Sequence, residues 1–266
     1  MYSDLIFWCL ILIIFRLIQN NIYLNQARVR YSYDDLSSNT GKKQFLYLID
    51  SVLEPLVPVT KNMEDFIDIK ASNVLKDSNK YNIGEYDVTK FAKRIEQIGF
   101  HKFPELSQYG KMTFFLPVNS AFDVRYKVLY LKNLNLIYQN LRVEIVDEEV
   151  VRAHIVPDQI LFTLPPRRRQ ELFPTLQYNS SSSFTNLEVK AKVSMKEVGP
   201  VVESKTMKGT KQHKRGTVEA NIIKANIPVQ NGIIHLIDRP LVVMASSLYE
   251  LLCVETSVQV SVAGGN

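Results

Sequence analysis

The sequence has little cysteine and histidine, with only Cys9 and Cys253 and four histidines among its 266 residues. Two cysteines exclude the disulfide framework that stabilises many small secreted domains. No Cys or His spacing matches a zinc finger, and no His-Glu-x-x-His occurs. The sequence therefore predicts neither a metal site nor a cofactor.

Motifs of covalent and phosphoryl chemistry are also lacking. The chain contains no Gly-x-Ser-x-Gly, no phosphate-binding glycine loop and no Cys-His arrangement with an orienting partner. The carboxylate groups Asp34-Asp35 and Asp147-Glu148-Glu149 are typical of solvated or helix-capping residues. We expect a non-enzymatic protein, with a hydrolase of unfamiliar arrangement as a remote alternative.

The chain lacks a long apolar run. Residues 5–15 are continuously apolar, but eleven residues at about 1.5 Å each fall short of a bilayer core of roughly 30 Å. This length suits the core of a signal peptide, so residues 1–27 are interpreted as a signal peptide, a signal anchor or an atypical N-terminus. Residues 258–266 are too short and too polar for a lipid-anchor signal.

Two apolar segments about a hundred residues apart are the most informative feature present. Asn231-Gly232 is typical of a tight turn with positive φ, and the alternating strand 233–237 follows it. Upstream, a short strand beginning at Thr113 and Phe114 stops at Pro117, and Asn119 is expected to cap a helix that starts at Ser120.

These segments resemble the two signature boxes of the fasciclin domain, an extracellular adhesion module. Residues 87–99 and 150–157 are similar to two helical segments of that family, so the resemblance covers roughly residues 60–246. The residues that match the family signature are Thr113, Phe114, Pro117, Asn119, Phe122, His154, Asn231, Gly232, His235 and Asp238.

Periodicity predicts an α+β fold. Helical patterns occupy the first half of the unit, with Asp87 as N-cap and Gly99 as C-cap of one helix, and a second helix begins at residues 147–149. Alternating strands occupy the second half, including 187–193, which Gly199-Pro200 is expected to end. The resemblance implies a two-sheet β-sandwich or wedge with helices packed at one end, in which the two boxes pair as adjacent buried strands.

The resemblance also implies a division of the chain. Residues 60–246 are assigned to a fasciclin domain, and residues 247–266 to a linker or the start of another repeat. Residues 28–59 are similar to the tail of a preceding repeat, because Leu48-Ile49-Asp50 stands where Leu236-Ile237-Asp238 does. The alternative is a strand whose sequence is merely similar and that is not part of a repeat.

Extracellular adhesion is the function that the resemblance implies, at the cell surface or in the matrix and associated with the membrane. Expected partners are other fasciclin-type domains, through homophilic contacts, or matrix and cell-surface receptors. Two integrin-linked elements of the family are altered here, because Ala153 takes the place of a Tyr before His154 and Asn226 takes that of an acidic residue. Both His154 and His235 are expected to be packed and hydrogen-bonded.

The strongest local concentration of positive charge lies in residues 205–215. It is predicted to be a solvated hairpin tip or, alternatively, a site for sulfated glycans or anionic lipids. A nucleic-acid partner is not expected, because no aromatic residue interrupts the run. Asn179 begins a glycosylation sequon. The predicted polyanion patch consists of Lys205, Lys208, Lys211, Lys214 and Arg215.

Overall fold

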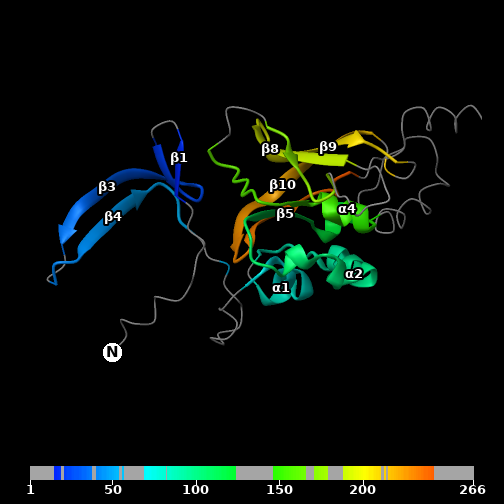
Figure 1. The fold of residues 1–266 in the computed structure, drawn as a ribbon, viewed down its shortest axis with the longest axis horizontal. Coiled ribbons are helices and arrows are strands. Elements are labelled where there is room, and N and C mark those ends of the chain that lie inside the picture. Colours follow the sequence, from blue (N-terminus) through cyan, green and yellow to red (C-terminus); the bar gives the residue numbers. More distant parts are fainter. Residues whose placement is uncertain are drawn as a thin grey trace, which may run out of the picture.

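The structure, a computed structural model, contains two β-sheets and a set of short helices (Figure 1). Within the part of the chain that is described, no helix is long and apolar enough to cross a membrane. The described residues are 15–18, 21–37, 40–53, 56, 69–81, 83–123, 146–165, 171–178, 188–210, 213 and 215–242.

The larger sheet has seven strands in the order β6-β5-β11-β10-β9-β8-β7. Together with the helices it forms the main unit, residues 69–242 (Figure 1). The bounds of its strands are Met112–Pro117 for β5, Ile155–Val156 for β6, Phe173–Pro174 for β7, Glu188–Lys196 for β8, Gly199–Lys208 for β9, Gly216–Val229 for β10 and Gly232–Ile237 for β11.

The long strand β10 divides this sheet into two halves. Its first part, Gly216 to Asn221, pairs with β9, whereas its second part, from Ile222 onward, pairs with β11. Two register shifts interrupt the pairing with β11, and such bulges bend a strand and increase its twist. One apolar cluster holds side chains from both halves, including Phe115 and Ile237 from one and Val189 and Val202 from the other. The two halves therefore pack against each other.

Helices cover the other face of the β5–β11 half (Figure 1). The apolar stripe predicted for residues 87–99 forms α2, and its buried side chains Phe91 and Ile95 share a core with Phe114 and Leu236. The helices of the described residues are α1 (Ala71–Lys76), α2 (Thr89–Ile98) and α4 (Glu148–Ala153), with 3-10 turns η2 (Ser78–Lys80), η3 (Phe100–Lys102), η4 (Pro104–Leu106) and η5 (Asn119–Phe122). The predicted α+β wedge is confirmed.

The pairing of the two signature strands is also confirmed. β5 and β11 lie side by side in parallel, with Phe114 opposite Ile234 and Leu116 opposite Leu236. Every residue of both strands is buried. A parallel strand pair covered on both faces is the usual setting for a near-continuous apolar run, and this accounts for the composition of both segments.

A smaller sheet precedes the main unit and lies at the left of Figure 1. Its four antiparallel strands follow the order β1-β2-β3-β4, so that β4 lies at one edge among the strands that the structure describes. Leu24 and Ala27 are its buried apolar side chains in the described region. The bounds are Phe15–Ile18 for β1, Asn21–Leu24 for β2, Ala27–Ser37 for β3 and Lys43–Ile49 for β4.

One expected boundary is wrong. Gly199 and Pro200 do not end the strand 187–193; they are the first residues of β9, and the turn lies at residues 197–198. Proline has no amide hydrogen to donate, and at the first residues of a strand the sheet does not require that hydrogen bond. Pro200 is therefore compatible with the start of β9. Leu56, which lies outside the span assigned to the domain, belongs to its core cluster.

Candidate functional site

The signature residues form the interior framework that holds the two central strands in register. Thr113, at 0% exposure, donates its hydroxyl to the carbonyl of Gln159 at 2.8 Å and accepts the amide of Leu161 at 2.9 Å. Pro117 ends the ladder opposite Ile237. The side chains of Phe114 and Phe122 are buried in the core shared with the helices.

Asn231 has a different role from the one predicted. Its φ is not positive, and its side chain is fully buried. The side-chain oxygen accepts the amide of Ala71, and the side-chain nitrogen donates to the carbonyls of Glu105 and Leu106, at 3.0 to 3.1 Å. Asn231 therefore ties α1 and η4 to the start of β11.

Gly232 does take the positive φ, at 149°. A Cβ atom at this position would lie 1.9 Å from the carbonyl oxygen of Met112. Glycine is therefore needed both for its backbone conformation and for the close approach of β5.

Asn119 does not cap the turn that it begins, contrary to expectation. Its side-chain oxygen accepts the amide of Lys90 at 2.8 Å, and its side-chain nitrogen donates to Asp87 at 2.7 Å and to Thr89 at 3.0 Å. Asp87 in turn accepts the Thr89 amide at 2.9 Å. Asp87 and Asn119 thus each accept a free backbone amide in the first turn of α2. Asp87 lies just before that helix in the sequence, whereas Asn119 follows β5.

Hydrogen bonding fixes the tautomers of the two buried signature histidines. His154 donates from Nδ1 to the Val150 carbonyl at 2.7 Å and accepts the Leu241 amide at Nε2 at 3.0 Å. His235 donates from Nε2 to the Leu161 carbonyl at 2.9 Å and accepts the Asn226 amide at Nδ1 at 3.2 Å. Burial lowers the pKa of each imidazole to about 4, because the charged form would lose its hydration.

Asp238 joins β10 and β11 at the end of the hairpin that lies opposite its turn. Its carboxylate accepts the backbone amide and the side-chain amide of Asn221 at 2.8 and 2.7 Å, and its own amide donates to the Asn221 carbonyl at 3.1 Å. No signature residue is arranged as a nucleophile with a base. In the described residues, this set consists of buried and hydrogen-bonded side chains that hold the domain together.

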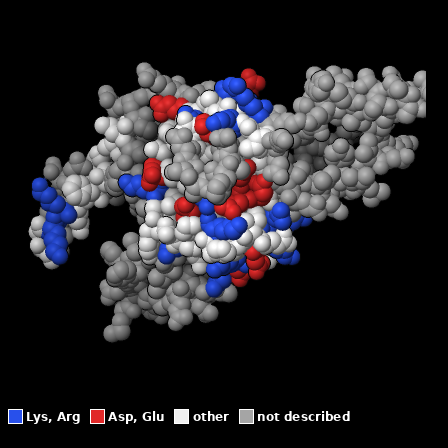
Figure 2. All heavy atoms as spheres, turned by 45° about the vertical axis from the view of Figure 1, so that its right-hand side comes forward, with Lys and Arg blue, Asp and Glu red and all other residues white. Residues whose placement is uncertain are grey.

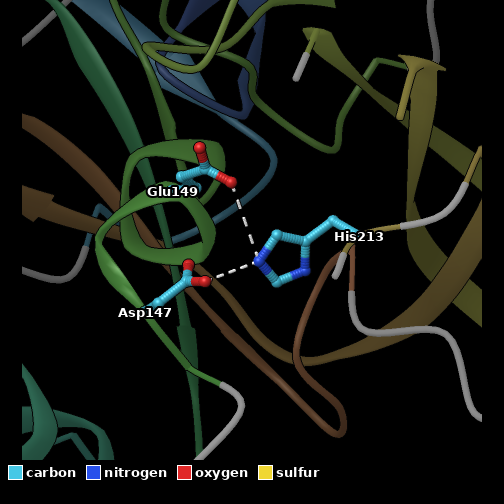
Figure 3. Close-up of side chains that lie close together, drawn as sticks. All are labelled: Asp147, Glu149 and His213. Atoms are coloured by element: carbon cyan, nitrogen blue, oxygen red, sulfur yellow. Dashed lines mark hydrogen bonds and ion pairs between the residues drawn. The ribbon is translucent and has the colours of Figure 1, made fainter. Parts of the chain in front are cut away.

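The basic loop between β9 and β10, which follows Lys208 and precedes Gly216, is held in place by the buried side chain of His213 (Figure 3). His213 is 2% exposed, and its Nε2 lies 2.6 Å from Asp147 Oδ2 and 3.8 Å from Glu149 Oε2. A tight turn positions the imidazole, since Thr210 and His213 exchange two hydrogen bonds at 2.7 and 3.0 Å. The segment is therefore more than a solvated tip, because its centre binds the start of α4.

The carboxylate of Asp147 serves two partners at once. Oδ1 accepts the Val150 amide at 2.9 Å and caps α4, while Oδ2 binds His213. Burial favours the neutral acid, but the hydrogen bonds from His213 and Val150 outweigh it, so the pKa of Asp147 lies below its ordinary value. Asp147, Glu149 and His213 are of metal-ligand type and lie within 4.8 Å of one another, yet the direct Nε2–Oδ2 contact already uses the atoms that a cation would need.

The predicted polyanion patch is only partly described. Lys205 is half-buried on β9, Lys208 and Arg215 are exposed, and Lys211 and Lys214 lie outside the described residues. Lys205 stands opposite Lys190 on β8. The glycosylation residue Asn179 also lies outside the described part of the chain.

Acidic groups accompany the lysines on these strands. Lys192 pairs with Glu203 at 2.9 Å, and Lys196 pairs with Glu219. Figure 2 shows basic and acidic side chains interspersed over the described surface that faces the viewer. Mixed signs reduce the potential that a polyanion would meet at this surface.

The loop anchor, defined as Asp147, Glu149 and His213, is the feature that the sequence did not reveal. Asp147 and His213 are 66 residues apart, and no local pattern links a helix start to a distant loop. The available signal was the histidine itself, which stands within a run of lysines where burial is unusual.

The fold, the paired central strands and the buried framework define a fasciclin-type module. A sequence model of the Fasciclin domain matches residues 86–243. The chain belongs to the Fasciclin domain family.

Named relatives agree with this assignment. The chain is 34% identical over 241 residues to Fasciclin-1 of Schistocerca americana, covering 88% of this chain and 32% of that protein. It is 28% identical over 235 residues to Fasciclin-1 of Drosophila melanogaster, covering 87% and 32%. A solved structure described as a FAS1 domain pair from the insect cell adhesion molecule Fasciclin I is similar with a TM-score of 0.37 and 16% identity, over 60% of this chain and 46% of that one. The chain spans about a third of the length of the two curated relatives.

Proposed function

We propose that this chain is part of an extracellular cell-adhesion protein and acts as a non-enzymatic binding module. The observation that carries the proposal is the family match over residues 86–243, together with two relatives named Fasciclin-1. Fasciclin I is described as an insect cell adhesion molecule. The expected location is the cell surface or matrix, in association with the membrane.

The chemistry of the site supports this proposal. The signature histidines are neutral, buried and committed to two backbone partners each. Their ring nitrogens are therefore occupied, and neither is placed to accept a proton from a substrate. The exterior carries charged side chains of both signs on β8 to β10, which suits a weak protein contact made many times over a surface.

The proposed contacts are homophilic. Beads coated with the full chain should cluster with like-coated beads, while the soluble chain associates with itself only weakly, because many copies convert weak contacts into adhesion. A second coating should begin at residue 51, which keeps Leu56 and removes the smaller sheet. Beads coated with the Gly232→Val variant, in which the β5–β11 contact is disrupted, serve as the folding control.

Three outcomes distinguish the kinds of adhesive contact. Clustering by both coatings and not by the folding control supports homophilic contact through the main unit. Beads that stay dispersed but adhere to receptor-bearing cells or matrix assign heterophilic contact instead. Clustering by the full chain alone assigns the effect to the smaller sheet and contradicts the proposal.

A second candidate function is binding of sulfated glycans or anionic lipids through the basic loop. The observation that favours it is the cross-strand placement of Lys205 beside Lys190, which brings two ammonium groups to one face of the sheet. The loop anchor holds His213 against the start of α4, which reduces the ordering that the described part of the loop requires on binding.

Heparin chromatography tests this candidate with matched charge. Neutralising Lys205, Lys208 and Arg215 to Gln should abolish salt-sensitive retention if the loop binds the polyanion. The control neutralises three exposed lysines elsewhere, Lys76, Lys93 and Lys111, and has the same net charge. Equal loss in both variants would assign retention to net charge alone and remove the loop from consideration.

A further inference from the structure

Asn231 and Gly232 form the only Asn-Gly pair in the sequence. Asparagine is a thermolabile residue, because the backbone nitrogen of the following residue can displace its side-chain amide. Glycine obstructs this attack least, since it has no Cβ atom. Asn231 lies in the turn before β11, and Gly232 is the first residue of that strand. A pair with a high intrinsic rate of amide loss therefore stands where the central strand begins.

The reaction open to this pair is intramolecular and needs only water as a co-reactant. The backbone nitrogen of Gly232 forms a bond to Cγ of Asn231, while the bond between Cγ and Nδ2 breaks. The proton of the Gly232 amide passes to the leaving nitrogen, which departs as ammonia and leaves a cyclic imide. Water then adds to either imide carbonyl and opens the ring to aspartate or isoaspartate at position 231. No atom is oxidised or reduced.

The folded main unit opposes the first step. The Asn231 side chain is 0% exposed, and its Oδ1 accepts the Ala71 amide at 3.0 Å. Its Nδ2 donates to the carbonyls of Glu105 and Leu106 at 3.1 Å. Ring closure requires Cγ to turn onto the backbone nitrogen of Gly232, so these bonds would have to break without replacement by water. The contacts that tie β11 to the helices therefore also protect the amide.

Protection lasts only while α1 and η4 remain against the start of β11. Ala71 belongs to α1, and Glu105 and Leu106 belong to η4, so separation of these segments frees the side chain and admits water. When opening is brief relative to the reaction, the observed rate is the rate of the open chain multiplied by the fraction of time spent open.

We propose that Asn231 is a deamidation site that the folded main unit protects, and that its modification makes prolonged opening of the unit irreversible. Chemical modification of the unfolded state is a general route to irreversible unfolding, and here the reactive pair lies within the contact that refolding must restore. The proposal rests on the fold and is independent of the proposed adhesive function.

Neither product fits the site. With aspartate at position 231, a carboxylate oxygen replaces Nδ2 and meets the carbonyls of Glu105 and Leu106, so an unpaired charge is buried among acceptors. Isoaspartate adds a methylene group to the backbone immediately before Gly232. This lengthening shifts Gly232 against Met112, where the packing is so close that a Cβ atom would lie 1.9 Å from the carbonyl oxygen. A chain modified while open therefore cannot restore the contact between β5 and β11.

Peptide mapping by mass spectrometry tests the site in the full chain. The protein is held near neutral pH in buffer and, in parallel, in guanidinium chloride, and the fractions of aspartate and isoaspartate at position 231 are followed with time. We expect conversion to be slower in buffer by about tenfold or more. In guanidinium chloride, where the fold no longer matters, Gly232→Ala should react several times more slowly than the parent, because its methyl group obstructs the attack.

Two kinds of result would overturn the assignment of the site. Equal rates in buffer and in guanidinium chloride would show that the fold gives no protection. An Asn231 that stays unmodified in guanidinium chloride, or a Gly232→Ala variant that reacts as fast as the parent, would show that the attack by the Gly232 nitrogen does not occur.

Refolding tests the irreversibility. Protein diluted from guanidinium chloride after increasing times should regain its native circular dichroism in a fraction that falls as the modified fraction rises. Asn231→Asp, which supplies one product directly, should refold poorly. Asn79→Asp, which makes the same charge change at an exposed position on η2, should refold like the parent. Modified chains that refold as completely as unmodified chains, or equal refolding of the two variants, would contradict the proposal.

Discussion

Asn231 accepts the backbone amide of Ala71 at 3.0 Å across 160 residues of chain. This bond joins the first helix of the main unit to the beginning of its last central strand. The side-chain amide of Asn231 satisfies two more carbonyls in η4, so that one residue fixes three segments.

Replacing Asn231 with Ala should therefore destabilise the domain by about 2–4 kcal/mol, because an amide and two carbonyls lose their buried partner. Urea unfolding followed by circular dichroism measures the change. The exposed Gln108→Ala variant, close in sequence to η4, is the control and should unfold like the parent. An Asn231→Ala midpoint equal to that of the control would contradict the role assigned to this side chain.

Gly232→Val should cost more than about 3 kcal/mol, since a Cβ atom meets the Met112 carbonyl at 1.9 Å and the φ of 149° is strained. Gly199→Val separates the two causes. Its φ is 133°, but nothing lies within 4 Å of a Cβ atom there, so only the backbone strain of about 1 kcal/mol applies. Similar unfolding midpoints for the two variants would show that the steric contact with β5 contributes less to the destabilisation than the backbone strain does.

Stability should fall on acidification between about pH 6.5 and pH 4. The pKa of His154 and of His235 is lowered to about 4 in the folded state, while the unfolded chain takes up protons near pH 6.5. The unfolded state therefore binds more protons in this window, and each histidine removes on the order of 3 kcal/mol of stability across it.

The pH dependence can be assigned with a variant. Free energies of unfolding should be measured from pH 7 to pH 4 for the parent and for His235→Gln. The variant should be less stable at pH 7 but lose less on acidification, since one of the two histidines with a depressed pKa is gone. Parallel pH profiles for the two proteins would show that His235 does not contribute.

Removing the loop anchor should expose the basic loop to protease. In His213→Ala, the contacts to Asp147 and Glu149 are lost, and trypsin should cut at Lys211, Lys214 or Arg215 several times faster than in the parent. His101→Ala, which removes an exposed histidine, is the matched control. Equal cleavage rates in all three proteins would show that the anchor does not restrain the loop.

Sequence patterns predicted the central architecture because it is local in origin. The alternation within β11 sends Ile234 and Leu236 to the core shared with the helices and Ile237 to the core between the half-sheets, and both assignments follow from a period of two. The helix α4 likewise begins where the acidic residues 147–149 predicted it.

Features that depend on contacts distant in sequence escaped prediction. Asn231 and Asn119 each follow a common local preference, for turns and for helix caps, yet the side chains of both bind segments brought near by the fold. The lysines around His213 predict a solvated loop. The burial of His213 was missed because it depends on a contact with Asp147, which is distant in sequence. A local pattern predicts which backbone conformations are favourable. The partners of these three side chains depend instead on which distant segments the fold brings together.

The parallel contact between β5 and β11 has a consequence for synthesis. The ribosome makes Met112 about 120 residues before its partner Gly232, and loop closure on that scale is slow. During that interval β5 is an apolar strand without its parallel neighbour, and α1 and α2 have no β11 to cover. The nascent chain therefore exposes this apolar surface until β11 has left the exit tunnel, and a stop before residue 237 yields a product that lacks part of β11 and cannot complete its core.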